Sequence, residues 1–195
     1  MNSKNESKEM LKKIAEEIKL CKKCILSKTR KNAVPGEGNI GKKIVLIGEA
    51  PGYNEDIQGR PFVGRAGKLL DNFLRSIGLE REEIFITNVV KCRPPQNRQP
   101  TDEEIKKCFP FLEKQLEIIQ PKLIICVGYI AAFSVFSKFG IEFSSMNKQH
   151  GKIYSINNLK YTLKIVATYH PAAILRNPNL MPLAKEDWEK IKEVI

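Results

Sequence analysis

The chain has 195 residues and a mass of 22.2 kDa, a length that predicts one domain covering residues 1–195. Apolar residues make up 42% and charged residues 28%, which excludes both a disordered tail protein and a membrane bundle. The net charge of +11 favours polyanionic partners, with nucleic acid as the leading candidate. A Lys-rich surface that serves only solubility is the alternative.

The N-terminal segment predicts an amphipathic helix over residues 7–20, with Ser7 as its cap. Its apolar residues recur at helical spacing, at Met10, Leu11, Ile14 and Ile18. The residues before it are polar and lack the apolar region of a secretory signal. No apolar stretch approaches the roughly 20 residues of a membrane span. We therefore expect a protein of the reducing cytoplasm without a membrane partner.

Short apolar runs alternate with helical patterns along the rest of the chain. The runs predict buried strands at 43–48, 84–90, 123–127 and 163–168. The helical patterns cover 66–77, 101–119 (opened by the capping box Thr101 to Glu104), 130–139 and 185–194. This order predicts an α/β fold, a three-layer αβα sandwich with a four-stranded, mainly parallel central sheet. A hairpin of 153–156 and 161–164, turning at Asn157 and Asn158, is expected to lead into the last strand.

Polar side chains follow each of the four predicted strands. The segments are GEAPGYNED (48–56), TNVVKC (87–92), CVGY (126–129) and YHPAAI (169–174). Since parallel strands end at one edge of a sheet, these segments predict a ligand site there. A single Pro-Gly turn after a strand usually does no more than end that strand. Polar segments at four strand ends together favour a functional site.

Four of the five cysteines form a pattern that suits a metal or a cluster. Cys21 and Cys24 form a Cys-x-x-Cys pair, and Cys92 and Cys108 follow much later, separated by a Pro-rich loop. Four thiolates suffice for zinc or for an iron-sulfur cluster. The wide second pair weakens a zinc ribbon, and basic neighbours would offset the negative charge of a 4Fe-4S cluster. A cluster is favoured, with zinc and unligated thiols as alternatives; Cys126, inside an apolar run, is expected to be a small buried hydrophobe.

Three motifs together with the four cysteines resemble the family 4 uracil-DNA glycosylases, the iron-sulfur members of their superfamily. The motifs are GEAPGYNEDIQGRPFVGRAGKLLD (48–71), ITNVVKCRPPQNRQP (86–100) and YHPAAILRNP (169–178). The resemblance spans residues 21 to about 178. It implies a parallel four-stranded αβα sandwich and the removal of uracil from DNA. It also implies a 4Fe-4S cluster, formed by the N-terminal Cys-x-x-Cys and the 92–108 loop and held by Cys21, Cys24, Cys92 and Cys108.

The resemblance also implies a pocket for an extruded base, since a glycosylase cannot reach a stacked one. Phe62 is expected to stack on uracil, and the Asn88 amide to match uracil O4 and N3–H. His170 is expected to face uracil O2 and, as a neutral imidazole, to stabilise the departing anion. Without the motifs, these residues would be a core Phe, a cap residue and a structural His.

The first motif adds Glu49, Ala50 and Glu55 to the predicted pocket. Some relatives outside family 4 carry an acid at the position of Ala50, where it activates water. A methyl group here favours a dissociative path with late capture of water. Glu55 is assigned to catalysis: it would orient that water, support the cationic sugar or obstruct the methyl group of thymine. Glu49 is expected either to contact uracil or to bond within the loop.

The segment after His170 is expected to contact DNA. In the superfamily the corresponding loop enters the minor groove, where Ile174 and Leu175 would act as a wedge and Arg176 would contact phosphate. Ordinary helix packing of the two apolar residues is the alternative. His150, in no motif, is expected to be a surface or loop residue. A related branch carries a covalently reacting His after the second motif; this chain has none there, so turnover is expected.

These features predict a monomeric, monofunctional uracil-DNA glycosylase of base excision repair. It would act on uracil-containing DNA, single- or double-stranded, and leave an abasic site. No Lys occupies a recognised nucleophile position, so no lyase step is expected. A noncatalytic iron-sulfur DNA-binding module and a zinc-bearing hydrolase of nucleotides are the alternatives.

Overall fold

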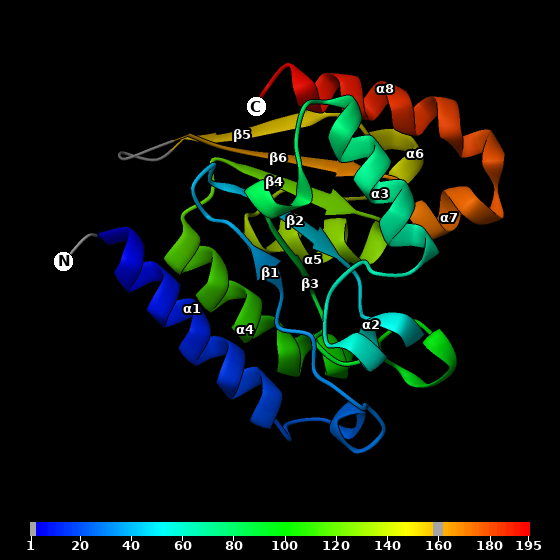
Figure 1. The fold of residues 1–195 in the computed structure, drawn as a ribbon. Helices are drawn as coiled ribbons and strands as arrows, with labels where there is room; N and C mark the ends of the chain where they lie inside the picture. The colour runs from blue at the N-terminus through cyan, green and yellow to red at the C-terminus, as the bar shows by residue number, and fades with distance from the viewer. Residues whose placement is uncertain (1–2, 158–161) are drawn as a thin grey trace.

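The computed structural model describes residues 3–157 and 162–195 as an α/β fold (Figure 1). Its strands are β1 (Glu37–Gly38), β2 (Ile44–Gly48), β3 (Phe85–Asn88), β4 (Leu123–Val127), β5 (Ile153–Asn157) and β6 (Thr162–Thr168). Its α-helices are α1 (Ser3–Leu20), α2 (Tyr53–Gln58), α3 (Arg65–Ser76), α4 (Asp102–Ile119), α5 (Tyr129–Lys138), α6 (Met146–Gln149), α7 (Pro171–Arg176) and α8 (Met181–Lys192). Short 3-10 turns cover Ile25–Lys28, Arg81–Glu83, Pro95–Asn97 and Pro178–Leu180.

The strands form one sheet in the order β1-β3-β2-β4-β6-β5. The four central strands pair in parallel, as predicted, while β1 and β5 pair antiparallel at the two edges. The predicted sheet is thus extended from four strands to six. A two-residue strand such as β1 leaves no periodic pattern in the sequence.

The C-terminal hairpin departs from its prediction in one respect. Within the described residues, the predicted strands 161–164 and 163–168 correspond to a single strand, β6, which begins at Thr162 and pairs with β5 from Thr162 to Val166. The two runs overlap, and an unbroken extended backbone satisfies both patterns. The predicted turn at Asn157 and Asn158 falls mostly outside the described residues.

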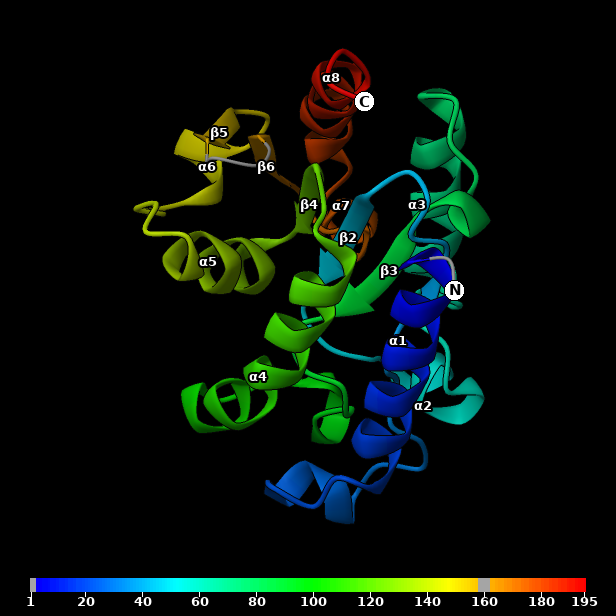
Figure 2. The same ribbon diagram turned by 90° about the vertical axis from the view of Figure 1, so that its left-hand side faces the viewer.

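The sheet is covered on both faces, which confirms the predicted sandwich. Helices α1, α4 and α5 lie on one face, and α3, α7 and α8 on the other (Figure 2). Alternate residues of each central strand enter opposite cores: in β4, Ile124 and Cys126 face one, while Ile125 and Val127 face the other. Cys126 is fully buried, as predicted. Within 3–157 and 162–195, no helix has both the length and the apolar character needed to cross a membrane.

Most predicted helices shift by only a few residues in the structure. Helix α1 begins at Ser3, one turn before the predicted cap at Ser7. Helix α4 begins as predicted, where Thr101 and Glu104 bond to each other's backbone N–H groups. The short helices α2, α6 and α7 were not predicted. Over residues 174–176, where a loop was expected with helix packing as the alternative, the structure has helix α7.

A buried carboxylate fastens α8 to the end of β6. Asp187 of α8 is fully buried, and one of its oxygens accepts a hydrogen bond from the Thr168 hydroxyl at 2.8 Å. Its other oxygen lies 2.7 Å from Nδ1 of His150, whose side chain is only 16% exposed. His150 is therefore a packed partner of Asp187 rather than the surface or loop residue that was expected. Its partner lies 37 positions away, beyond the reach of a local pattern.

We predict that Asp187→Ala lowers the free energy of unfolding by about 1–3 kcal/mol, because it leaves the Thr168 hydroxyl without its buried acceptor. Urea denaturation followed by circular dichroism measures this change. Glu186→Ala is the matched control: its exposed pair with Lys190 should contribute about 0.5 kcal/mol or less. Equal effects of the two substitutions would contradict the anchoring role.

Candidate active site

A cavity of about 440 Å³ opens at the carboxyl ends of the parallel strands. In Figure 1 the arrowheads of β4 and β6 point toward this side, where α7 lies. Parallel register brings the strand ends level, since Gly48 pairs with Asn88 and Val127 with Thr168. The cavity is lined by seven of the predicted site residues: Glu49, Ala50, Glu55, Phe62, Asn88, His170 and Arg176. The structure therefore brings together residues that lie more than 120 positions apart in the chain.

An aromatic ring and an imidazole ring lie face to face in the cavity. The ring centroids of Phe62 and His170 are 5.7 Å apart, and their planes are inclined by 27°. Phe62 is only 6% exposed and its backbone has a φ of 51°, a left-handed conformation that is uncommon for a bulky residue. The Phe62 ring therefore offers a fixed apolar surface to a planar ligand.

Asn88 ends β3 and places its amide against Gly48 at the end of β2. Its side chain is buried, with 2% exposure. A Cβ atom at Gly48 would lie 2.6 Å from Cζ of Phe62 and would collide with Oδ1 of Asn88. Only glycine at position 48 lets the stacking ring and the amide approach the same strand end.

His170 caps helix α7 with its own side chain. Its Nδ1 accepts a hydrogen bond from the backbone N–H of Ala172 at 3.1 Å. A neutral ring that accepts at Nδ1 carries its proton on Nε2. Burial, and to a lesser extent the positive charge of Arg176, lower the pKa of His170 to about 4, against the opposing effect of Glu55. The geometry thus defines a neutral imidazole with Nε2–H as its donor.

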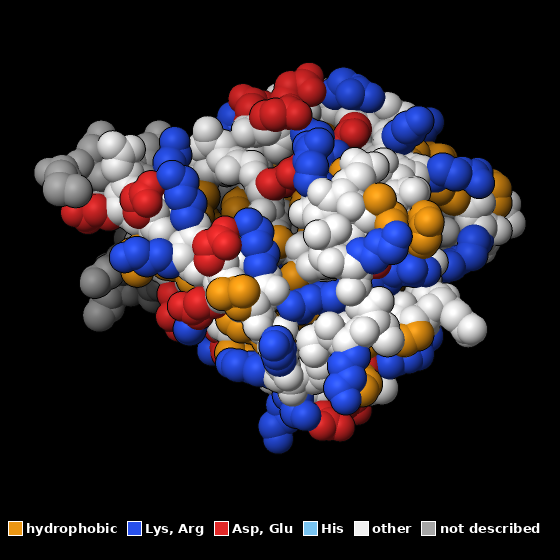
Figure 3. Space-filling view, turned by 60° about the horizontal axis from the view of Figure 1, so that its bottom comes forward, with side chains coloured by type: hydrophobic (Ala, Val, Ile, Leu, Met, Phe, Trp, Pro, Cys, Tyr) orange, Lys and Arg blue, Asp and Glu red, His pale blue; other side chains and the backbone are white. Residues whose placement is uncertain are grey.

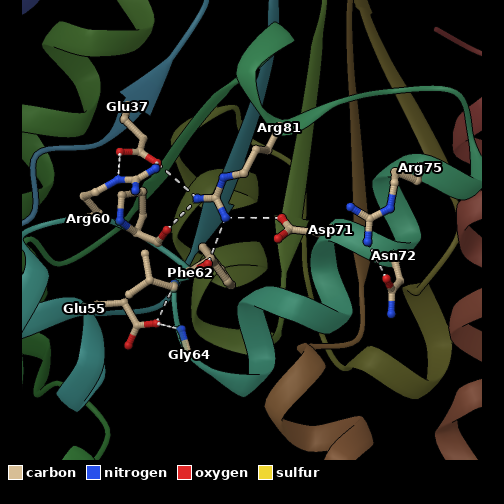
Figure 4. Close-up of polar contacts among 11 residues, drawn as sticks. Glu37, Glu55, Arg60, Phe62, Gly64, Asp71, Asn72, Arg75 and Arg81 are labelled. Carbon is tan, nitrogen blue, oxygen red and sulfur yellow. Dashed lines mark hydrogen bonds and ion pairs between the residues drawn. The ribbon is translucent and has the colours of Figure 1, made fainter.

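The two glutamates of the cavity have different surroundings. One carboxylate oxygen of Glu55 accepts hydrogen bonds from the backbone N–H groups of Val63 and Gly64, both at 2.9 Å (Figure 4). Burial raises the pKa of Glu49, whereas the nearby positive charge of Arg176 lowers it. Glu55 therefore fixes the loop that follows Phe62, and Glu49 lines the cavity within range of the positive charge of Arg176.

The two apolar residues predicted as a wedge have different environments. Ile174 is 1% exposed and packs in the core beneath α7, so in this structure it presents no side chain to DNA. Leu175 is 42% exposed and is the one member of the pair at the surface. A helix turns successive side chains about 100° apart, which separates the two residues. The wedge prediction is corrected for Ile174.

The four predicted cluster ligands line a second, smaller cavity between α1, α4 and the end of β3. Cys92 accepts a hydrogen bond at Sγ from Nη1 of Arg30 at 2.9 Å, and Cys108 accepts one from the backbone N–H of Lys91 at 3.2 Å. Hydrogen bonds to sulfur are typical of cysteines that hold iron-sulfur clusters. Among the residues that the structure describes, no three His, Cys, Asp or Glu side chains form a group that could hold a single metal ion.

A buried lysine connects this cysteine cavity to the active-site cavity. Lys91 is 1% exposed and its Nζ donates to Oγ1 of Thr87, the backbone carbonyl of Asn88 and Oε1 of Gln115, at 2.6, 2.8 and 2.8 Å. Burial lowers the pKa of Lys91 to about 7, against the opposing effect of Cys108 and Cys92. The Lys91 side chain thus ties the end of β3 to Gln115 of α4, while the Lys91 backbone N–H bonds to Cys108 in the cysteine cavity.

Comparison with known proteins agrees with this geometry. The model of the Uracil DNA glycosylase superfamily matches residues 35–192. The chain belongs to this superfamily. It is 50% identical to the type-4 uracil-DNA glycosylase of Archaeoglobus fulgidus over 95% of this chain and 94% of that protein. The identity is 52% to the type-4 enzyme of Sulfurisphaera tokodaii (94% and 84%) and 44% to that of Thermotoga maritima (96% and 95%). The resemblance to family 4, the type-4 enzymes, is confirmed.

The active-site cavity of this superfamily member has further lining residues to which the sequence analysis assigned no role. The Pro-rich loop after Cys92 contributes Pro94, Asn97, Arg98 and Gln99, and the strand ends contribute Gly128, Tyr129 and Tyr169. Tyr129 and Tyr169 were part of the converging segments, and Tyr169 opens the third motif, but neither was assigned a role. Arg98 is placed by a two-bonded ion pair with Glu104, at 2.7 and 2.9 Å, six residues along the chain. Pro-rich loops have no period from which such a position can be predicted.

The pKa of His170, lowered to about 4, sets the pH range in which the ring is neutral. We predict that His170 titrates near pH 4 and remains neutral between about pH 5 and 8. The unfolded chain binds this proton more readily, so the stability that His170 contributes is present above about pH 6.5 and is lost as the pH falls toward 4.

Two-dimensional NMR of the imidazole Cε1–H groups measures this titration directly, because the chain has only two histidines. The His170 resonance is assigned by its loss in His170→Asn. A midpoint near pH 6.5 would contradict the predicted state of the ring.

Proposed function

We propose that this protein hydrolyses the N-glycosidic bond of deoxyuridine in DNA, acting as a monomer and leaving an abasic site. One observation carries the proposal: Phe62, Asn88 and His170 line a single cavity at the carboxyl edge of the sheet. These side chains supply an apolar stacking surface, an amide with a donor and an acceptor, and a neutral N–H donor. The names of the type-4 relatives support the same reaction.

The cavity would recognise the base by stacking against its flat face and by hydrogen bonding to its edge. Uracil flipped out of the DNA stack would lie on Phe62, with its O4 and N3–H facing the amide of Asn88. Cytosine presents an amino group and an unprotonated N3 at the same edge, so the amide of Asn88 would be left facing like groups. Because an unpaired buried polar group costs about 1–3 kcal/mol, this mismatch selects against cytosine.

Cleavage depends on stabilising the base as it leaves. When the bond between N1 and the sugar breaks, its electron pair remains on uracil, and negative charge develops on O2. The Nε2–H of His170 would donate a hydrogen bond to O2 in a site from which water is excluded. The bond from Ala172 to Nδ1 fixes both the tautomer and the orientation of the ring. The donor is therefore in place before the charge develops.

Water has to reach the cationic sugar without a strong base at position 50. Ala50 lines the cavity with a methyl group, which supports a dissociative path. Glu55 has one carboxylate oxygen bonded to the loop after Phe62, and its other oxygen is available to orient water or to stabilise the sugar. No lysine is among the residues that line the described cavity, which supports hydrolysis without a lyase step.

DNA would approach over a positively charged surface. Figure 3 shows Lys and Arg side chains spread over the face that lies at the bottom of Figure 1, where they exceed Asp and Glu. Arg176 lines the cavity and is placed to contact phosphate, while exposed Leu175 is placed to fill the gap left by the flipped base. Neutralised phosphates release counterions, so binding should weaken as salt rises.

The cysteine cavity is proposed to hold a 4Fe-4S cluster through Cys21, Cys24, Cys92 and Cys108. The donor set fits, since four thiols line one cavity and two of the sulfurs accept N–H bonds. When bound, the cluster would serve as a structural cross-link between α1, α4 and the loop after β3. Hydrolysis of the glycosidic bond requires no electron transfer from it.

The reaction is tested with an oligonucleotide that contains one uracil, followed by alkali to cleave the strand at abasic sites. We predict scission at uracil, no scission of the matched thymine strand, and a loss of about 100-fold or more in His170→Ala, because the leaving group loses its donor. Binding of the His170→Ala protein to the same DNA should persist. An intact uracil strand with wild-type protein would indicate the noncatalytic DNA-binding module instead.

The cluster is tested independently of activity. We predict that protein purified without oxygen absorbs near 400 nm, contains about four iron and four sulfide per chain, and loses both in Cys108→Ala. Cys126→Ala is the matched control, since Cys126 is buried in β4, does not line the cysteine cavity and should leave the spectrum unchanged. Stoichiometric zinc without visible absorption would overturn the assignment.

A further inference from the structure

The stacking residue Phe62 occupies a backbone conformation that needs support from its surroundings. Its φ of 51° lies in the left-handed region, which a bulky residue rarely adopts. Such a conformation persists where neighbouring groups hold the backbone in place. We infer that Arg81 is a positioning residue that holds the Phe62 turn, and thereby sets the surface on which the flipped base stacks. This inference rests on the proposed function and extends it to a residue outside the cavity.

Arg81 bonds to two consecutive carbonyl groups of the turn (Figure 4). Its Nη2 donates to the carbonyl oxygen of Pro61 at 2.8 Å, and its Nη1 to that of Phe62 at 3.0 Å. The same two nitrogens donate to carboxylates, Nη2 to Glu37 at 3.1 Å and Nη1 to Asp71 at 3.2 Å. Each terminal nitrogen thus joins the turn to an acid that is fixed elsewhere in the fold.

The turn is held from its other side by Glu55. Arg81 donates hydrogen bonds to the carbonyl groups of Pro61 and Phe62, and Glu55 accepts hydrogen bonds from the N–H groups of Val63 and Gly64. The Arg81 guanidinium and the Glu55 carboxylate therefore satisfy backbone hydrogen-bonding groups of four successive residues, 61–64. Charge-assisted hydrogen bonds of this kind are stronger than neutral ones. Together, Arg81 and Glu55 fix the backbone on both sides of the Phe62 ring.

Close packing leaves no room for the turn to relax toward α3. A Cβ atom at Gly67, in the first turn of α3, would collide with the carbonyl carbon and oxygen of Phe62. The same carbonyl oxygen accepts the Arg81 bond. The Phe62 carbonyl thus lies between the α3 backbone and the Arg81 guanidinium. Loss of the guanidinium would leave this buried acceptor without that donor.

The position of Arg81 in the chain couples the two parts that would contact the base. Arg81 begins the 3-10 turn Arg81–Glu83, which leads directly into β3. Asn88 ends that strand. A single side chain therefore ties the turn that carries the stacking ring to the start of the strand that carries the reading amide.

Lysine cannot replace arginine in this arrangement. Arg81 uses two nitrogens on a planar group to reach four acceptors, two on the turn and two on carboxylates. A lysine has one nitrogen with three donors and no planar fork. Arg81 is only 15% exposed, so water does not readily take over the lost bonds.

Arg60 provides a matched control in the same network. Its Nε and Nη2 donate to the two oxygens of Glu37, at 2.8 and 2.9 Å, from a side chain that is 55% exposed. None of its hydrogen bonds that the structure describes goes to the turn carbonyls. Arg60→Gln therefore removes a positive charge and a Glu37 contact while leaving the hydrogen bonds of Arg81 to Pro61 and Phe62 intact.

The first experiment measures steady-state kinetics on the uracil oligonucleotide. Arg81→Gln and Arg81→Lys should each lower kcat by about 10- to 100-fold while KM changes by less than about threefold, because a displaced ring disturbs the flipped base more than the DNA contacts. Arg60→Gln should stay within about twofold of wild type. In a Phe62→Leu background, Arg81→Gln should add less than about threefold, because its effect passes through the ring. Full additivity, or equal kcat in Arg81→Gln and Arg60→Gln, overturns the inference.

The second experiment needs neither DNA nor turnover. The nine phenylalanines are replaced by 4-fluorophenylalanine, and the ¹⁹F resonance of Phe62 is identified by its loss in Phe62→Leu. This resonance should shift or broaden in Arg81→Gln and remain unchanged in Arg60→Gln; an unchanged resonance in both overturns the inference. Wild-type protein that shows the expected spectra but releases no uracil would refute the proposed function alone.

A milder variant covers the case in which Arg81→Gln does not fold. Asp71→Asn weakens one anchor of Nη1 but leaves both turn carbonyls bonded to Arg81. It should shift the Phe62 resonance less than Arg81→Gln and lower kcat by about two- to fivefold. Thermal denaturation of each variant establishes that it is folded. A folded Asp71→Asn protein with wild-type kinetics and an unshifted resonance counts against the inference.

Discussion

Parallel pairing of β3, β2, β4 and β6 is the constraint on which the site depends. Strands that run in one direction end at one edge, and their backbone hydrogen bonds fix how far each end projects. The pairing of Gly48 with Asn88 and of Val127 with Thr168 places the Asn88 amide and the segment before His170 at the same level. The cavity is a consequence of this register, because no single element contains more than a fraction of its residues.

Those aspects of the fold that have a local pattern were predictable from the sequence. Buried strands in a covered sheet are continuous apolar runs, and the capping box at Thr101 marks the start of α4. Glu49, Phe62, Asn88 and His170 stand at strand ends or in motifs, so their convergence followed once a parallel sheet was expected. For these residues, the motifs together with the expected parallel sheet were enough to predict that they meet at one site.

Other features depend on contacts between distant segments, which no local pattern encodes. The burial of Ile174 follows from the short helix α7 and its packing against the second core. His150 finds Asp187 far along the chain, and Arg81 finds carbonyl groups near position 62. A polar side chain with a buried partner looks in sequence like one on the surface. The errors in the sequence predictions therefore concern residues whose surroundings come from distant segments rather than the apolar strands.

The side chain of His170 both starts a helix and faces the cavity, and this limits what evolution can place at position 170. A substitute has to accept a bond from the Ala172 N–H and still offer a donor to a ligand. Few side chains have both capacities on opposite sides, and an aliphatic or acidic residue has at most one of them. A substitution at this position would therefore disturb the start of α7 and, under the proposed function, the donor to uracil at the same time.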